Sequence, residues 1–217
     1  MLPGPNQIVA CPHCEALAQY GTLISGNTFG ARVWTDGKQI APMLPHPPAV
    51  AKCRHCAECY WLADAREVGT IDPWGDESNQ SDPIWRAAPE VEEPSETDFY
   101  VALNKGLAND DQQERELRIL AWWRRNDVYR DGVRGAKQTT LTEEGRRNLV
   151  ELVRMLDEAD ESDRIMKAEA LRELGEFKAA GEILDRVTSE EYAAVVRQLR
   201  QLCDNRDPCV NELQFGG

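Results

Sequence analysis

The chain has 217 residues, a hydrophobic content of 41% and a mean hydropathy of -0.56. This length predicts one domain of ordinary size plus a smaller one, and the composition is typical of a thin core with much solvated helix surface. The formal net charge of -13 falls mostly between residues 63 and 98. The N-terminal segment is therefore close to neutral and lacks the basic stripe of a nucleic-acid-binding module.

No stretch of the chain contains the roughly 20 apolar residues that span a bilayer, which predicts a protein without membrane contact. Residues 1–7 lack the basic start and the apolar stretch of a signal peptide, so a cytoplasmic location is expected. Thiols stay reduced in the cytoplasm, and seven cysteines, an odd number, fit a disulfide framework poorly. Paired cysteines are therefore expected to bind metal.

Two pairs of cysteines carry the strongest chemical signal, Cys11 with Cys14 and Cys53 with Cys56. Two C-x-x-C pairs separated by enough chain for a small sheet are the usual composition of a tetrahedral four-thiolate zinc site. Four thiolates close the coordination shell, so the predicted Zn²⁺ is structural and not catalytic. It would hold together a segment that is poor in apolar residues.

Two alternatives use the same cysteines differently. Cys59 forms an overlapping C-x-x-C with Cys56 and could replace it as a ligand, although a free thiol is the preferred interpretation. The motif from Cys11 to Cys14 taken alone resembles the redox pair of oxidising thiol-disulfide oxidoreductases. That chemistry needs a strand before the motif and a long helix after it, whereas Gly21 soon follows. This enzyme is the first alternative function, and a nucleic-acid-binding zinc ribbon is the second.

Residues 1–63 are predicted to form the zinc-ribbon-like β module, because short alternating runs are interrupted by glycine-rich turn signals. Asp36-Gly37 predicts a hairpin turn, since glycine takes the positive φ that such turns require. Residues 64–94 carry many acids and four prolines, which predicts an acidic linker. Several apolar residues in this linker predict that it is partly pinned to a domain surface, and these are Trp74, Ile84, Trp85 and Val91.

Residues 95–217 show the periodicity of successive helices, for which we expect antiparallel hairpins joined by short loops. Ser95 and Thr142 are predicted to cap two of the helices, and Thr188 with Glu191 predicts a capping box for the last long one. Gly132 and Gly135 are expected to end the longest helix. The predicted fold class is α+β, with a small β zinc ribbon followed by an all-α helical-hairpin domain.

Two resemblances extend this layout. Leu174-Gly175, Phe177 and Ala180 match the centre of a tetratricopeptide repeat, which implies one helix crossing the next. The whole chain also resembles a group of uncharacterised bacterial proteins with a two-knuckle module and a helical tail. The segments that carry this resemblance are residues 25–31, 34–37, 41–45 and 60–65. It implies the two-part layout and no activity. The position of Cys59 is an ordinary residue in such sequences, which supports ligation by the other four cysteines.

One aromatic and basic cluster, Trp122-Trp123-Arg124-Arg125, could bind a peptide or an anionic partner. Adjacent tryptophans lie about 100° apart on a helix, so we expect one in the core and the other over a neighbouring element. No Ser/His/Asp set, phosphate loop or dinucleotide fingerprint is present, and no catalytic or cofactor-binding residue is predicted beyond the metal ligands. The sequence therefore favours a non-enzymatic adaptor that binds another protein through its helices.

Overall fold

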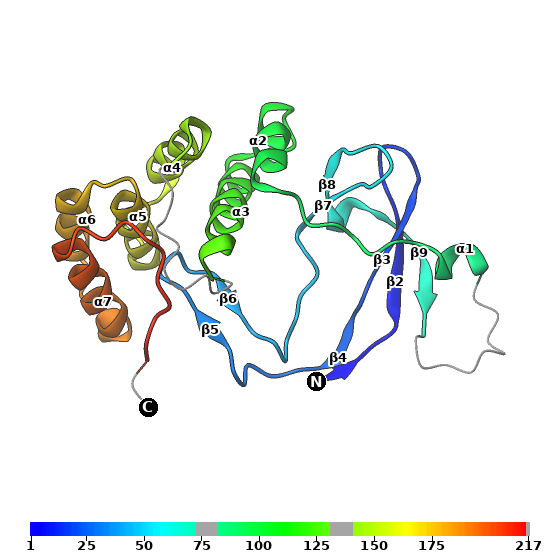
Figure 1. Ribbon diagram of the computed structural model, residues 1–217, viewed down its shortest axis with the longest axis horizontal. Coiled ribbons are helices and arrows are strands. Elements are labelled where there is room, and N and C mark those ends of the chain that lie inside the picture. Colours follow the sequence, from blue (N-terminus) through cyan, green and yellow to red (C-terminus); the bar gives the residue numbers. More distant parts are fainter. Residues whose placement is uncertain (73–81, 131–140, 216–217) are drawn as a thin grey trace. The chain divides into compact units, whose positions relative to one another are not determined.

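The computed structural model describes residues 1–72, 82–130 and 141–215, and it divides into two compact units. The first unit comprises Met1–Ala31 and Ala41–Leu107, and the second comprises Arg32–Ile40 and Ala108–Gly217. Small strands dominate the N-terminal part and helices the C-terminal part, so the predicted mixed α+β character is confirmed (Figure 1). Trp74, Gly132 and Gly135 lie outside the described residues.

The first unit is built on a three-stranded antiparallel sheet with β2 at its centre, between β3 and β9 (Figure 1). Ile8, Val9 and Ala10 of the central strand β2 are all buried, so both faces of this strand are covered, since successive side chains point to opposite faces. Two smaller two-stranded sheets pair β1 with β4 and β7 with β8. The strands of this unit are β1 (Leu2–Pro3), β2 (Asn6–Ala10), β3 (Leu17–Tyr20), β4 (Leu23–Ser25), β7 (Val50–Lys52), β8 (Cys59–Trp61) and β9 (Arg66–Ile71).

Part of the stretch expected to be linker is regular structure. It contains β9, which pairs with β2, and the short helix α1 (Pro83–Arg86). An added Cβ at Gly69 would lie 2.4 Å from the Trp85 ring, so the indole covers the backbone of β9 there. Val91 packs against the core of the unit, and Glu92 accepts the N–H of Lys52 at 2.8 Å. These contacts hold residues 85–92 on the first unit.

Helix α2 (Glu96–Asn104) also belongs to the first unit. Ser95 caps it as predicted, because the N–H of Asp98 donates to Ser95 Oγ at 3.2 Å and the Asp98 carboxylate accepts the N–H of Ser95 at 3.0 Å. The indole N–H of Trp61 donates to the carbonyl oxygen of Leu107 at 3.1 Å. This bond ties the chain that follows α2 to β8.

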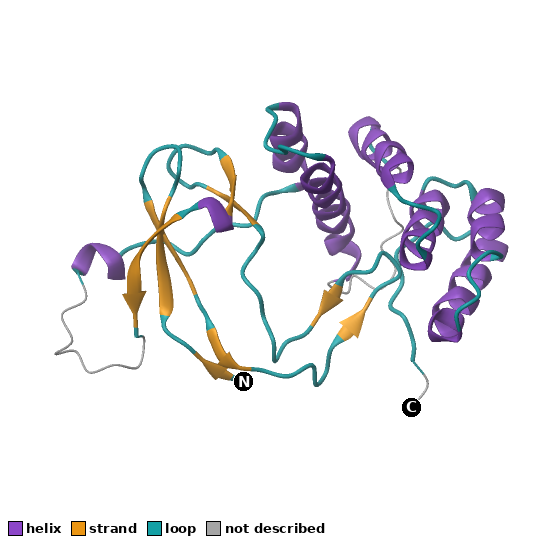
Figure 2. Cartoon of the chain, turned by 180° about the vertical axis from the view of Figure 1, so that it is seen from behind, coloured by secondary structure: helices purple, strands orange, loops and turns teal. Residues whose placement is uncertain are grey.

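The second unit contains the remaining helices, and each packs against the next along the chain (Figure 2). Trp122, Leu149 and Leu152 belong to one apolar cluster of its core, and Ala180, Leu184 and Leu199 belong to another. The bounds of the helices are α3 (Asp111–Arg130), α4 (Glu143–Met155), α5 (Glu161–Glu173), α6 (Phe177–Leu184), the 3₁₀ turn η2 (Glu190–Tyr192) and α7 (Ala193–Asp204). None of the described helices is both long enough and apolar enough to cross a membrane.

Of the two predicted caps in this unit, one is confirmed and one is wrong. Thr142 Oγ1 accepts the N–H of Gly145 at 3.0 Å at the start of α4. Thr188 instead gives its N–H and its hydroxyl to the Glu161 carboxylate, at 2.9 and 3.1 Å. An ionised acceptor on the first turn of α5 makes stronger hydrogen bonds than a neutral capping box.

The hairpin predicted at Asp36-Gly37 is present, formed by β5 (Arg32–Val33) and β6 (Gln39–Ile40), and Gly37 has a φ of 82°. It belongs to the second unit, although the flanking chain on both sides belongs to the first. The N–H of Leu213 donates to the carbonyl oxygen of Val33 at 2.8 Å, which adds the C-terminal segment to the hairpin. Residues from early in the chain thus complete the helical unit.

Buried charges hold the tip of this hairpin. Asp36 and Arg130 are 1% and 3% exposed, and the guanidinium group of Arg130 donates to both oxygens of the Asp36 carboxylate. Asn126 Nδ2 donates to Asp36 Oδ2 at 2.9 Å and to Glu173 Oε1 at 2.8 Å. The indole N–H of Trp123 donates to the carbonyl oxygen of Asp36 at 2.9 Å. The hairpin therefore contributes a charge that compensates the buried guanidinium.

Candidate metal centre

The two C-x-x-C loops have the same backbone geometry, and we refer to them as the knuckles, residues 11–16 and 53–58. In each, the N–H of the first cysteine donates to the carbonyl oxygen five residues later at 2.9 Å, and its carbonyl accepts the N–H four residues later. Glu15 and Ala57, which follow the second cysteine of each knuckle, have φ angles of 58° and 62°. This left-handed residue turns the chain back after the second cysteine of each knuckle.

The four thiols converge on one point. The Sγ atoms of Cys14 and Cys53 are 3.6 Å apart, those of Cys11 and Cys56 are 3.9 Å apart, and all four lie within 4.8 Å of one another. A tetrahedral zinc ion with bonds of about 2.3 Å to sulfur needs sulfurs about 3.8 Å apart. The spacing is therefore compatible with a zinc site, and the donor set of four cysteines can hold a metal ion.

Backbone N–H groups lower the pKa values of the buried thiols, whereas burial raises them. The N–H groups of His13 and His55 approach the sulfurs of Cys11 and Cys53, each at 3.4 Å. Burial raises the pKa of Cys11 to about 12. Burial also acts to raise the pKa of Cys53, but N–H groups of its knuckle and neighbouring thiols lower that pKa to about 7. Thiolates this close repel one another, and a divalent cation would remove that repulsion.

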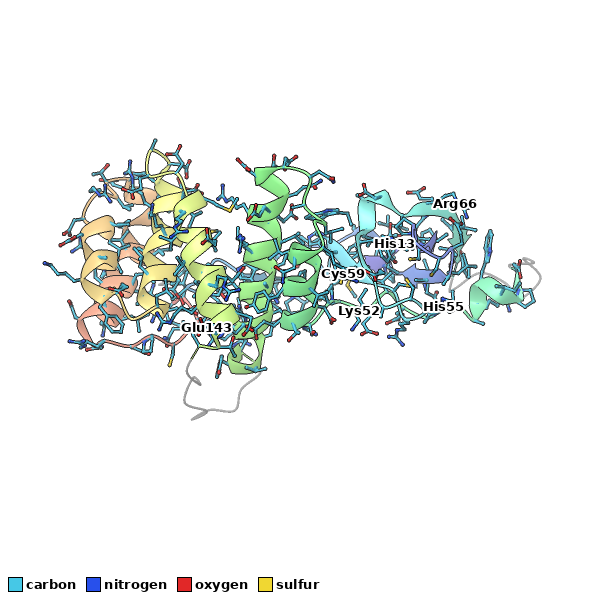
Figure 3. All side chains as sticks on the ribbon, turned by 90° about the horizontal axis from the view of Figure 1, so that it is seen from above. His13, Lys52, His55, Cys59, Arg66 and Glu143 are labelled. Atoms are coloured by element: carbon cyan, nitrogen blue, oxygen red, sulfur yellow. The ribbon has the colours of Figure 1, made fainter. Side chains whose placement is uncertain are left out.

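Cys59 stays outside the cluster, which consists of the other four cysteines of the N-terminal segment. Its thiol donates to the carbonyl oxygen of Asp98 in α2, at 4.0 Å, and burial raises its pKa to about 11. His13 and His55 are both exposed, and a ring nitrogen of His13 lies 3.4 Å from the carbonyl oxygen of Cys59. Figure 3 shows His13, Cys59, Lys52 and His55 in the same part of the first unit.

The cysteines of the centre belong to an apolar core of the first unit. It consists of a few buried side chains that pack with the cysteines, and these are Val9, Ala51, Tyr60, Leu62 and Ala65. Because the thiols are part of this core, a metal ion that joins them would stabilise the packing of the first unit. A metal ion at the four thiols would link β2 to β7, since each knuckle directly follows one of these strands.

The predicted aromatic and basic cluster is spread over different environments. Trp122 is 1% exposed and Arg125 is 8% exposed, so neither side chain is available to a partner. Trp123 is half-buried and covers the hairpin through its bond to Asp36. Trp122 lies in the core and Trp123 lies over the hairpin because adjacent residues of α3 point about 100° apart around the helix. The Arg124 side chain keeps 36% of its surface exposed and lies 3.5 Å from the Asp127 carboxylate.

Sequence reasoning did not find the buried polar group around Asp36. Its members lie on the hairpin, α3 and α5, and Asp36 and Arg130 are separated by 94 positions in sequence. No spacing rule connects residues so far apart. The only local signal was the turn motif Asp36-Gly37, which explains the hairpin but gives no partner for the carboxylate.

Comparison of the chain with protein-family models, with curated proteins and with solved structures finds no match. The chemistry of this centre is that of four soft sulfur donors within 4.8 Å of one another, two of them on buried cysteines.

Proposed function

We propose that this chain is a zinc-binding, non-enzymatic protein-interaction or adaptor protein, in which a structural zinc ion orders the first unit and the helices bind a protein partner. The convergence of four cysteine thiols within 4.8 Å of one another carries this proposal. Soft thiolate donors in a tetrahedral set favour zinc, or iron, over hard cations such as Mg²⁺ and Ca²⁺. Four thiolates also leave no open coordination position for a substrate.

The accessibility of the thiols supports a structural role over the thiol-disulfide enzyme. An oxidoreductase attacks its substrate with the first cysteine of the motif, which must be exposed and have a lowered pKa. Cys11 is 1% exposed, and burial raises its pKa. That enzyme mechanism uses one C-x-x-C motif and has no role for a second knuckle whose thiols lie beside those of the first. A closed four-thiolate metal shell requires both knuckles.

Cobalt substitution tests the donor set. Co²⁺ bound by four thiolates is expected to give intense sulfur-to-metal charge-transfer absorption, because each Co–S bond contributes to it. Replacing Cys14 with Ser should weaken this absorption, whereas Cys59→Ser should leave it unchanged, because Cys59 bonds to Asp98 instead. Equal spectra for Cys14→Ser and the unchanged protein would contradict the four-cysteine site.

A groove of about 680 Å³ between α6 and α7 supports a helical binding surface. Phe177 and Gly181 line it on α6, and Arg200 lines it on α7. An added Cβ at Gly181 would meet no atom within 4 Å, so this glycine leaves the backbone of α6 open to the groove.

The groove is tested by filling it. Gly181→Arg places a long side chain in the groove, while Gly181→Ala adds a single methyl group into open space. A protein captured by chemical cross-linking with the unchanged chain and with Gly181→Ala, but lost with Gly181→Arg, would support this surface. Capture that is equal for all three chains would contradict it.

A further inference from the structure

The four clustered cysteines differ in their exposure to solvent. Cys11 and Cys53, the first of each knuckle, are 1% and 7% exposed, whereas Cys14 and Cys56 are partly exposed. The sulfurs of the two buried cysteines also face a backbone N–H, at 3.4 Å in both knuckles. A small oxidant in solution therefore reaches the second cysteine of each knuckle before the first.

Two short sulfur–sulfur distances join the two knuckles. Cys14 lies 3.6 Å from Cys53, and Cys11 lies 3.9 Å from Cys56. Each pair combines a partly exposed cysteine from one knuckle with a buried cysteine from the other. If the sulfur of Cys14 or Cys56 is oxidised, a buried cysteine of the other knuckle therefore lies within 4 Å of it.

We propose that the four-cysteine centre is also a redox site, which a hydroperoxide such as hydrogen peroxide converts into two cross-knuckle disulfides, Cys14–Cys53 and Cys11–Cys56, with release of the metal. This inference rests on the proposed function, because it takes the four metal-bound thiolates as the starting state.

The chemistry balances with two molecules of peroxide. The Cys14 thiolate attacks one oxygen of hydrogen peroxide, which gives a sulfenic acid and hydroxide. The Cys53 thiolate then attacks the sulfur of that sulfenic acid, a sulfur–sulfur bond forms, and a second hydroxide leaves. The two sulfurs lose the two electrons that the peroxide gains. The same steps at Cys56 and Cys11 consume a second peroxide, and the metal leaves because no thiolate ligand remains.

Whether the disulfides form between the knuckles or within each knuckle decides whether the first unit stays folded after the metal has left. Cross-knuckle disulfides join the same two segments that the metal joins, so the first unit keeps its structure after the metal has left. Disulfides within a knuckle would close only the short C-x-x-C loops and leave the two segments unlinked. Cys59 takes no part, because its half-buried thiol bonds to the carbonyl oxygen of Asp98.

Peptide mapping of the full chain tests the pairing. The protein is loaded with zinc, its metal content is measured, and hydrogen peroxide is added while a chelating dye reports released zinc. Trypsin cleaves after Lys52 and Arg54, which puts Cys53 and Cys56 on separate peptides, while Cys11 and Cys14 share the peptide 1–32. We expect both later peptides to be linked to 1–32, through Cys14 and Cys11 respectively, with two peroxides consumed for each zinc released.

The outcomes separate this inference from the proposed function. A protein that holds no zinc before peroxide is added contradicts both proposals. A protein that holds zinc but gives bonds within each knuckle, bonds to Cys59, or sulfinic acids without disulfides contradicts only the redox site. The matched variant Cys59→Ser should release zinc at the same rate and give the same map. Circular dichroism should show the strands retained after oxidation and lost after reduction with a chelator present.

Discussion

Asp36 joins the tip of the hairpin to helix α3 of the second unit. Its carboxylate is paired with the buried guanidinium of Arg130, and Arg130 also bonds to Asp127 at 3.0 Å. Removing one member of a buried ion pair leaves an uncompensated charge, which typically destabilises a protein by about 3–5 kcal/mol. The buried pair thus makes the second unit dependent on a residue from the first sixth of the chain.

Asp36→Ala is expected to lower the free energy of unfolding by an amount near the lower end of that range, because Asp127 still compensates part of the charge on Arg130. Urea denaturation followed by circular dichroism measures the change. Lys178→Ala is the matched control, since the Lys178 side chain is 93% exposed and its removal should change stability by less than about 0.5 kcal/mol. Equal effects of the two substitutions would contradict the role given to Asp36.

Glu173 is the residue whose pKa makes stability depend on pH. Burial raises this pKa from its ordinary value of 4.5 to about 8, with smaller contributions from the nearby charges of Glu169 and Asp36. The folded state therefore holds the proton more tightly than the unfolded state. The stabilisation is fully present below the ordinary pKa and is lost as the pH rises through the window from 4.5 to about 8.

The free energy of unfolding of the unchanged protein, relative to that of Glu173→Gln, should therefore fall as the pH is raised from about 5 to about 8, by at most about 1.4 kcal/mol per pH unit. The neutral amide of glutamine has no such dependence and can still accept the hydrogen bond from Asn126. Measuring both proteins in the same buffers cancels any effect of pH on metal binding. A difference that is constant over this range would show that Glu173 titrates normally.

The hairpin β5–β6 is the element that links the sequence of the first unit to the core of the second. A fragment spanning residues 95–217, the predicted helical domain, lacks this hairpin and leaves Arg130 and Asn126 without Asp36. We expect the fragment to melt well below the full chain and with low cooperativity. Attaching residues 31–41 to its N-terminus through a flexible linker should restore cooperative melting, and a fragment that is fully stable without them would contradict this dependence.

Elements whose signals are local could be predicted from the sequence. The caps at Ser95 and Thr142 use residues three positions apart, and the turn at Asp36-Gly37 depends on the backbone freedom of one glycine. The predicted cap at Thr188 failed because Glu161, which precedes it by 27 positions, offers a charged acceptor. The pairing of β9 with β2 had no signal either, because the acids and prolines around β9 are typical of a linker.

The same distinction applies to the candidate site. Each knuckle is defined by two thiols with two residues between them, so the four cysteines could be singled out from spacing alone. The position of Cys59 could not be fixed in this way, because it also obeys the spacing rule. What separates it from the cluster is a hydrogen bond to the carbonyl oxygen of Asp98, on a helix that lies far along the chain.

At the scale of the whole molecule, the two units differ in what stabilises them. The second unit has two apolar clusters and a buried polar network, while the first has an apolar cluster that includes the four cysteines of the candidate metal centre. Removing zinc with a chelator under reducing conditions should therefore unfold the first unit and leave most of the helical signal in place. Hydrogen exchange read by mass spectrometry should show protection lost in β2, β3 and β9 and kept in α5 and α6. Equal loss of protection in both units would contradict this separation.

The most direct measurement of the central claim is the zinc content of the purified, reduced chain after equilibration with excess zinc and removal of unbound metal. Native mass spectrometry and elemental analysis should give one zinc ion per chain, and a variant with Ser at Cys11, Cys14, Cys53 and Cys56 should bind none. A structural site is filled when metal is present, because its binding energy is part of the folding energy. Less than about half an equivalent in the unchanged chain, or equal zinc content in the two proteins, would contradict the claim.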